Sequence, residues 1–226
     1  MKTIPFFFIA LNIILSCSNS SKENSKENID PIINYRQEMR DFVIAISTTA
    51  KTINPDFIVI PQNGIELITS NGEETGTPML DYINAIDGNG QEDLFYGYTN
   101  EDQATPKSDT EYLKSFLNIS KNSGNTILVT DYCSTPAKML NSIELNAEQS
   151  YFSFAANHKN LDNIPDYPEN PINENIESIE QLSQIKNFLY LINPENYDTK
   201  TQFVSAVSAT NYDLIIIDLF FKDGSS

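Results

Sequence analysis

The stretch TEYLKSFLNISKNSGNTILVTD, residues 110–131, decides the fold class. Its first half places Leu113, Phe116 and Leu117 on one stripe, which is the spacing of an amphipathic helix. A Ser-Gly-Asn turn then leads into ILVT (127–130), a short continuous apolar run that is typical of a strand buried on both faces. A helix followed by such a strand predicts an α/β domain with a parallel sheet.

Helical and strand signals alternate through the rest of the chain. Apolar residues recur at three- and four-residue steps from Tyr35 to Ile53, which predicts an amphipathic helix, and a second helix is expected from about Thr199 to Ala209. The further strand candidates are Phe57–Ile60, Ala85–Asp87 with Leu94–Tyr98, Phe152–Ala155, Phe188–Ile192 and Leu214–Ile217. No glycine-rich phosphate loop follows any of these runs, so a (β/α) barrel is favoured over a nucleotide-binding doubly wound sheet.

The first 17 residues, MKTIPFFFIALNIILSC, indicate where the protein resides. A positively charged start, an apolar run over 4–15 and a final cysteine resemble a bacterial lipobox, in which Cys17 is acylated. Residues 18–33 are polar and repetitive, which predicts a disordered tether to a domain over 34–226. We therefore expect an extracytoplasmic protein anchored by lipid to a bacterial membrane, at the outer membrane or cell surface. A plain secretory signal or a short membrane anchor is the alternative.

Charge and rare residues exclude several functional classes. The formal net charge of −17 opposes nucleic-acid binding, which needs basic patches. If Cys17 is lipidated, Cys133 has no partner for a disulfide. With His158 as the single histidine, neither a zinc site nor a Cys-His nucleophile is expected. No metal and no cofactor are predicted.

Polar residues follow the predicted strands. Those closest to the strand ends are Gln62, Asn63, Glu66, Asp87, Glu92, Asp93, Asp131, Tyr132, Asn157, Asn193, Glu195 and Asp218. Carboxylates, amides and tyrosines suit a hydroxyl-rich ligand, and a pair of carboxylates performs glycoside hydrolysis. Asp and Asn also cap the helices that follow strands, so a purely structural role is the alternative at each position.

Five segments resemble one enzyme family. They are FIVIPQNGIELI (57–68), YINAIDGNGQEDLFYGY (82–98), ILVTDYCSTP (127–136), FLYLINPENY (188–197) and NYDLIIIDLFF (211–221). Together they resemble the glycoside hydrolase family 114-like group, TIM barrels related to endo-α-1,4-polygalactosaminidase and including lipoproteins. The resemblance covers nearly everything after Ile33, and PQNG and EDLFYG are its most specific parts.

The resemblance implies a (β/α)8 TIM barrel that acts on an amino-sugar polysaccharide or oligosaccharide. Glu92 matches the segment that carries one of the family's two catalytic carboxylates, so it is the expected general acid/base. The substrate-binding residues that we expect are Gln62, Asn63, Glu66, Asp87, Asp93, Tyr96, Asp131, Tyr132 and Asp218. Alternatively, Gly88, Gly90 and Gly97 make a loop in which Glu92 is merely solvated.

The chain also departs from the family pattern. Segments resembling 188–221 normally open the family's barrel and those resembling 35–132 close it, so the order here is permuted. The family's central strands and its other catalytic Asp have no counterpart, and about 190 residues fall short of the roughly 250 of a TIM barrel. We therefore expect an incomplete barrel, inactive unless a complementing downstream fragment supplies the rest. A non-catalytic carbohydrate-binding lipoprotein, or a chain without a stable fold, are the alternatives.

Overall fold

The computed structural model describes residues 33–166 and 171–225, and contacts group residues 34–226 into one compact unit. Cys17 and all but the last residue of the predicted tether lie outside the described residues. Within the part that is described, no helix has the length and apolar character needed to cross a bilayer.

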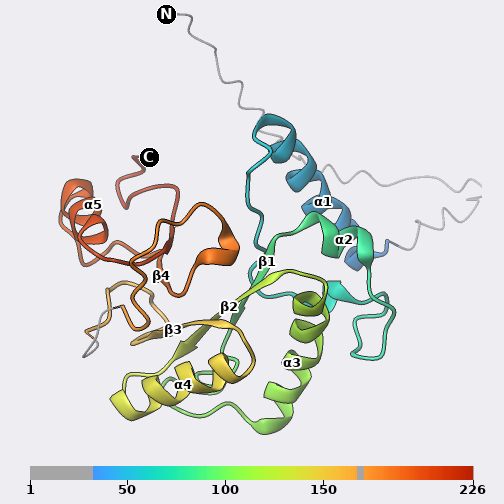
Figure 1. The fold of residues 1–226 in the computed structure, drawn as a ribbon, viewed down its shortest axis with the longest axis horizontal. Coiled ribbons are helices and arrows are strands. Elements are labelled where there is room, and N and C mark those ends of the chain that lie inside the picture. Colours follow the sequence, from blue (N-terminus) through green and yellow to red (C-terminus); the bar gives the residue numbers. More distant parts are fainter. Residues whose placement is uncertain (1–32, 167–170, 226) are drawn as a thin grey trace, which may run out of the picture. The chain divides into compact units, whose positions relative to one another are not determined.

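The strands are all parallel and follow one another across the domain in chain order (Figure 1). They are β1 (Gly88–Glu92), β2 (Thr126–Tyr132), β3 (Phe152–Ala156), β4 (Phe188–Leu191) and β5 (Leu214–Ile217). The first three form one hydrogen-bonded sheet and the last two form another, with β3 beside β4. The predicted α/β class with β-α-β units is therefore confirmed, and the described residues form no closed barrel.

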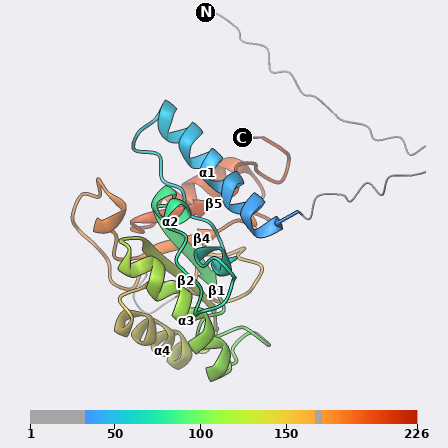
Figure 2. The ribbon, with the colours of Figure 1, turned by 90° about the vertical axis from the view of Figure 1, so that its right-hand side faces the viewer.

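Helices connect the strands and pack outside them. They are α1 (Tyr35–Ile53), the 3-10 turn η1 (Ile65–Ile68), α2 (Leu80–Ala85), α3 (Lys107–Asn122), α4 (Pro136–Glu148), the 3-10 turn η2 (Leu182–Gln184) and α5 (Lys200–Ser208). In both ribbon views α3 and α4 lie on the same side of the first sheet, and α1 and α5 lie at the two ends of the arrangement in Figure 1 (Figures 1 and 2). Such a layout places the carboxyl ends of the strands at one common edge.

Side chains alternate along β2 between two hydrophobic cores. Ile127 and Val129 pack with Phe116 in the core beneath α3, whereas Leu128 and Tyr132 pack with residues of β3 and β4 in the inner core. A strand that is buried on both faces in this way explains the continuous apolar run of the sequence.

The prediction of a strand at Phe57–Ile60 is wrong in detail. This segment is extended and lies beside β1, where the Val59 carbonyl accepts a hydrogen bond from Asp87 N at 2.9 Å. The Pro61 carbonyl accepts from Gly90 N at 2.9 Å, but only one bridge, between Gln62 and Gly90, reaches strand geometry. Proline lacks the N–H that a regular ladder would need, and the Asp87 carboxylate takes up the Val59 N–H at 2.7 Å. We call residues 57–63 the edge segment.

The glycine-rich stretch is a strand and not a loop, and the predicted strands Ala85–Asp87 and Leu94–Tyr98 are wrong. Gly88–Glu92 is β1, whereas Ala85 ends α2. A Cβ on Gly88 would lie 2.5 Å from the Thr126 carbonyl oxygen, and one on Gly90 would lie 1.9 Å from Gln62 Oε1. The Thr126 backbone leaves room only for glycine at position 88, and at position 90 the Gln62 side chain occupies the space of a Cβ. Glycine at these positions explains why β1 lacks the apolar residues that normally reveal a strand.

Helix α1 has the predicted bounds, but most of its apolar stripe does not reach the core. Arg40 and Ser47 are the buried residues, and they donate hydrogen bonds to Leu67 O at 2.8 Å and Ala85 O at 2.5 Å. The exposed large apolar residues of this helix are Tyr35, Met39, Phe42, Ile46 and Ile53, and we call them the α1 stripe. The helix therefore docks through Val43 and Ile44 together with polar contacts to backbone carbonyls, and it leaves an apolar surface uncovered.

Candidate functional site

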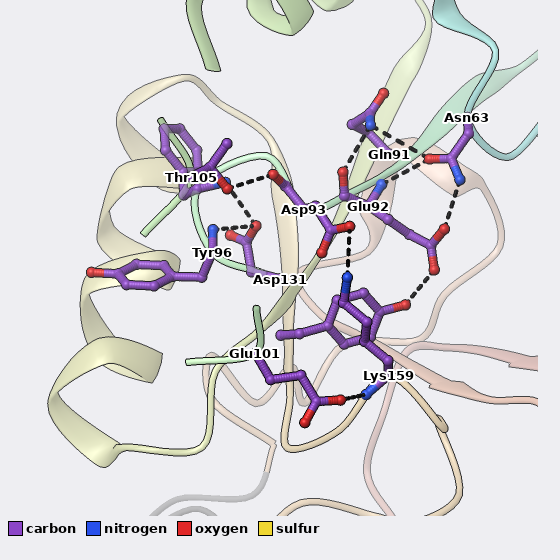
Figure 3. A network of polar contacts seen from close by, with 11 residues as sticks. Asn63, Gln91, Glu92, Asp93, Tyr96, Glu101, Thr105, Asp131 and Lys159 are labelled. Carbon is purple, nitrogen blue, oxygen red and sulfur yellow. Dashed lines mark hydrogen bonds and ion pairs between the residues drawn. The ribbon is translucent and has the colours of Figure 1, made fainter. Parts of the chain in front are cut away.

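Glu92 is the last residue of β1 and lies at the carboxyl edge of the sheet. Its carboxylate accepts two hydrogen bonds, one from the Tyr132 hydroxyl at the end of β2 and one from Asn63 Nδ2 at 2.6 Å (Figure 3). Three parallel segments thus meet at one carboxylate. Because both donors are neutral, they fix its position without neutralising its charge.

Asn63 clamps both the backbone and the side chain of Glu92. Its amide oxygen accepts from Glu92 N at 3.0 Å and from Gln91 Nε2 at 3.4 Å, while its amide nitrogen donates to the carboxylate (Figure 3). The Asn63 backbone has a φ of 57°, the left-handed conformation that asparagine tolerates better than most residues. The Asn-Gly pair at the end of the edge segment therefore turns the chain and holds Glu92 at the same time.

A cavity of about 280 Å³ opens beside Glu92. Its lining residues are Asn63, Glu66, Gln91, Glu92, Asp93, Tyr98, Asp109, Tyr112 and Leu113. Four of these are acids and none is a lysine or arginine, so the cavity favours a cationic or hydroxyl-rich ligand. Aromatic rings beside carboxylates are the surroundings in which sugars bind, because rings cover C–H faces and carboxylates accept from hydroxyls.

Asp93 follows Glu92 but has a different environment. Its carboxylate pairs with Lys159 Nζ at 3.4 Å, and its φ of 60° turns the chain away from the strand direction (Figure 3). Burial raises the pKa of the Asp93 carboxyl, and Lys159 offsets part of that rise. The Lys159 ammonium also lies 5.4 Å from the centre of the Tyr132 ring. Lys159 therefore contacts both Asp93 and the tyrosine that donates to Glu92.

Two tyrosines near Glu92, Tyr132 and Tyr190, have phenol pKa values above the ordinary value. Burial first, and then the hydrogen bond to Glu92, raise the pKa of the Tyr132 phenol far above its ordinary value. Burial and the nearby Glu92 charge also raise the pKa of Tyr190, which lies on β4. Both hydroxyls therefore keep their protons at neutral pH.

Asp131 is fully buried and faces α4 instead of the cavity. Its carboxylate accepts from Phe95 N at 2.8 Å, Tyr96 N at 3.1 Å, Ser142 Oγ at 2.6 Å and Asn146 Nδ2 at 3.1 Å. Figure 3 shows Asp131 with Tyr96. Burial raises its pKa to about 6 despite these four donors. Asp131 thus holds the loop after β1 in place and does not line the cavity.

Other predicted site residues lie elsewhere. Asp87 precedes β1 and pairs with Lys51 at 2.9 Å, about 16 Å from Glu92 along the strand. Asp218 follows β5 and lines a separate apolar cavity of about 120 Å³. Tyr96 donates its hydroxyl to Asn141 Oδ1 on α4 at 2.7 Å, and Gln62 is exposed beside Gly90. The structure therefore brings Asn63, Glu66, Glu92, Asp93 and Tyr132 together and places the rest of the predicted set outside this cluster.

Sequence reasoning missed Lys159, Tyr190, and the cavity residues Tyr98, Asp109 and Tyr112. Lys159 comes three residues after β3, so the strand-end rule that selected Asn157 could have included it. Tyr190 lies within an apolar run and carried no separate signal. Tyr112 and Asp109 belong to α3, and only the packing of that helix beside β1 brings them to Glu92.

The single histidine, His158, and the cysteine of the folded domain, Cys133, do not line this cavity. Cys133 is buried, and burial raises the pKa of its thiol well above the ordinary value. The His158 side chain is 54% exposed and lies 4.0 Å from Glu101. Within the described residues, no three His, Cys, Asp or Glu side chains are grouped as metal ligands.

No protein-family model matches the chain, and no curated protein matches it either.

Proposed function

We propose that the Glu92 cavity binds an amino-sugar polysaccharide and that Glu92 is the acid–base residue of a glycoside hydrolase. The observation that carries this proposal is the Glu92 carboxylate itself. It lies at the carboxyl end of a parallel strand, held by Tyr132 and Asn63, and it faces a cavity lined by acids and tyrosines. The ammonium group of an amino sugar suits that acidic lining, and the family resemblance names the same residue.

Hydrolysis requires a second carboxylate on the other side of the scissile bond. Glu66 and Asp109 line the same cavity and are the candidates, because Asp93 is paired with Lys159. The direct test is the release of reducing ends from a de-N-acetylated galactosamine polymer by native cells that carry the full chain, because the incomplete barrel is expected to be inactive by itself. We expect Glu92→Gln to abolish release, Glu66→Gln or Asp109→Asn to lower it at least 100-fold, and Glu148→Gln on the exposed end of α4 to leave it unchanged.

The second candidate is a carbohydrate-binding protein without catalysis. Three predicted acids, Asp87, Asp131 and Asp218, lie away from Glu92, which favours binding over turnover. Titration calorimetry with the same polymer distinguishes the two proposals. Binding that Glu92→Gln weakens, with no reducing ends released, would establish this second function, and the absence of binding would refute both.

We also propose that the domain is held outside the cytoplasm by a lipid on Cys17. Its support is the sequence of residues 1–17. Metabolic labelling with a radioactive fatty acid tests it. Label should enter the wild-type chain and be absent from Cys17→Ser, whereas equal labelling of both would refute the anchor.

A further inference from the structure

Two edges of the strand array carry no further strand. Among the described residues, β5 pairs with β4 alone, and the edge segment pairs with β1 alone. The backbone N–H and C=O groups of Ile58 and Ile60 have no hydrogen-bond partner in the described part of the chain. Unpaired groups of this kind on an extended segment form a template for another strand.

Apolar side chains surround both edges. On one side Phe57 and Ile58 are 46% and 44% exposed, and the residues of the α1 stripe that precede them in the chain are exposed as well. On the other side Ile217 and Leu219 are 47% and 73% exposed. The large apolar side chains at the two edges together expose on the order of 1,000 Å². This is comparable with the roughly 800 Å² that each partner buries in a standard protein–protein interface.

We propose that these two edges are the docking site for a polypeptide that contributes two further parallel βα units. The edge segment and β1–β5 make six parallel segments in consecutive order, and a closed barrel of this type has eight strands. At about 30 residues per unit, the docked polypeptide would contribute roughly 60 residues. Its strands are apolar, because they are covered on both faces, and its helices pack against α1 and α5.

The backbone edges favour a polypeptide over the other occupants of an apolar surface. The hydrocarbon of a membrane has no groups that could pair with the N–H and C=O of Ile58 and Ile60. A second copy of this chain would bring six more strand segments, too many to close either array. The proposal does not depend on the function of the Glu92 cavity.

Photo-crosslinking in the native cells tests the docking. A benzophenone amino acid replaces Phe42 on α1 or Phe220 after β5, which are 61% and 53% exposed, and Leu140 on α4, which is 50% exposed, is the control position. We expect positions 42 and 220 to crosslink to one polypeptide, at sites within about 60 residues of each other. Position 140 should give no such product.

A substitution at the β5 edge tests the same docking surface, and a substitution on α4 is its matched control. Ile217→Lys at the β5 edge should reduce the crosslinking yield from position 42 at least tenfold, and Leu140→Lys on α4 should not change it. Both side chains are about half exposed, so the thermal unfolding midpoint should stay the same in each variant. Crosslinks only to lipid, only to a second copy of this chain, to two unrelated proteins, or to nothing would overturn the proposal.

Discussion

Replacing Asp131 with asparagine changes how the stability of this protein depends on pH. Burial raises the pKa of the Asp131 carboxyl to about 6 in the folded protein, compared with 3.8 in its ordinary state. The folded state therefore holds this proton more tightly than the unfolded state does. The stabilisation from that proton is fully present below about pH 4 and is lost as the pH rises through about 6.

The size of the effect follows from the two pKa values. A difference of about two pKa units corresponds to about 3 kcal/mol of unfolding free energy. Asp131→Asn has no carboxyl to titrate and nearly the same shape. Relative to the wild type, the variant should therefore gain about 3 kcal/mol in unfolding free energy between pH 4 and pH 7.

Urea unfolding followed by far-UV circular dichroism measures this difference, since the chain has no tryptophan to report unfolding by fluorescence. The other carboxyls titrate in both proteins and cancel in the comparison. Ser142→Ala removes one donor that lowers the pKa of Asp131, so it should move the midpoint of the wild-type pH dependence upward. Parallel pH profiles for wild type and Asp131→Asn would refute the reasoning, as would a profile in which the wild type gains stability relative to the variant as the pH rises.

Two further predictions concern the first strand and its anchor. Gly88→Ala should lower the unfolding free energy by roughly 2–3 kcal/mol, because the new methyl group meets the Thr126 backbone. Gly90→Ala should lower it by less than about 1 kcal/mol, because the new methyl group meets the Gln62 side chain, which can move away. Equal losses in chemical denaturation would contradict this assignment of close approach. Asp87→Ala should lower the unfolding free energy by about 1–2 kcal/mol, because the Asp87 carboxylate also accepts a hydrogen bond from Val59 N. Lys51→Ala should lower it by about 0.5 kcal/mol, because the partly exposed ion pair itself contributes little. The same denaturation measurement checks this order, and a larger loss for Lys51→Ala would reverse it.

Helix α4 shows why part of the fold could not be predicted from the sequence. Its buried face carries Ser142 and Asn146 beside Met139. These polar residues are buried because they donate to Asp131, so the helix lacks a continuous apolar stripe. Hydrophobic periodicity detects burial only where the buried side chains are apolar.

The candidate site was partly accessible to sequence reasoning. Glu92 and Asn63 were selected because polar residues follow strands, and the structure brings them within hydrogen-bond distance at 2.6 Å. Asp131 also follows a predicted strand, yet its side chain lies on the face of β2 that is covered by α4. There its carboxylate accepts a hydrogen bond from Ser142 Oγ. Position along the chain places a residue at a strand end, but the pleat and the local turn decide which face it occupies.

The sequence by itself determined the elements whose buried residues are apolar. Continuous apolar runs specified β2, β4 and β5, and periodic apolar residues specified α3, because burial of such side chains is the main favourable term in folding. Only the tertiary structure decided the elements that depend on close approach or buried polar contacts. The glycine strand β1, the docking of α1 through Arg40, and the cluster of Asn63 and Tyr132 around Glu92 each join residues that are distant along the chain, so no local pattern records them.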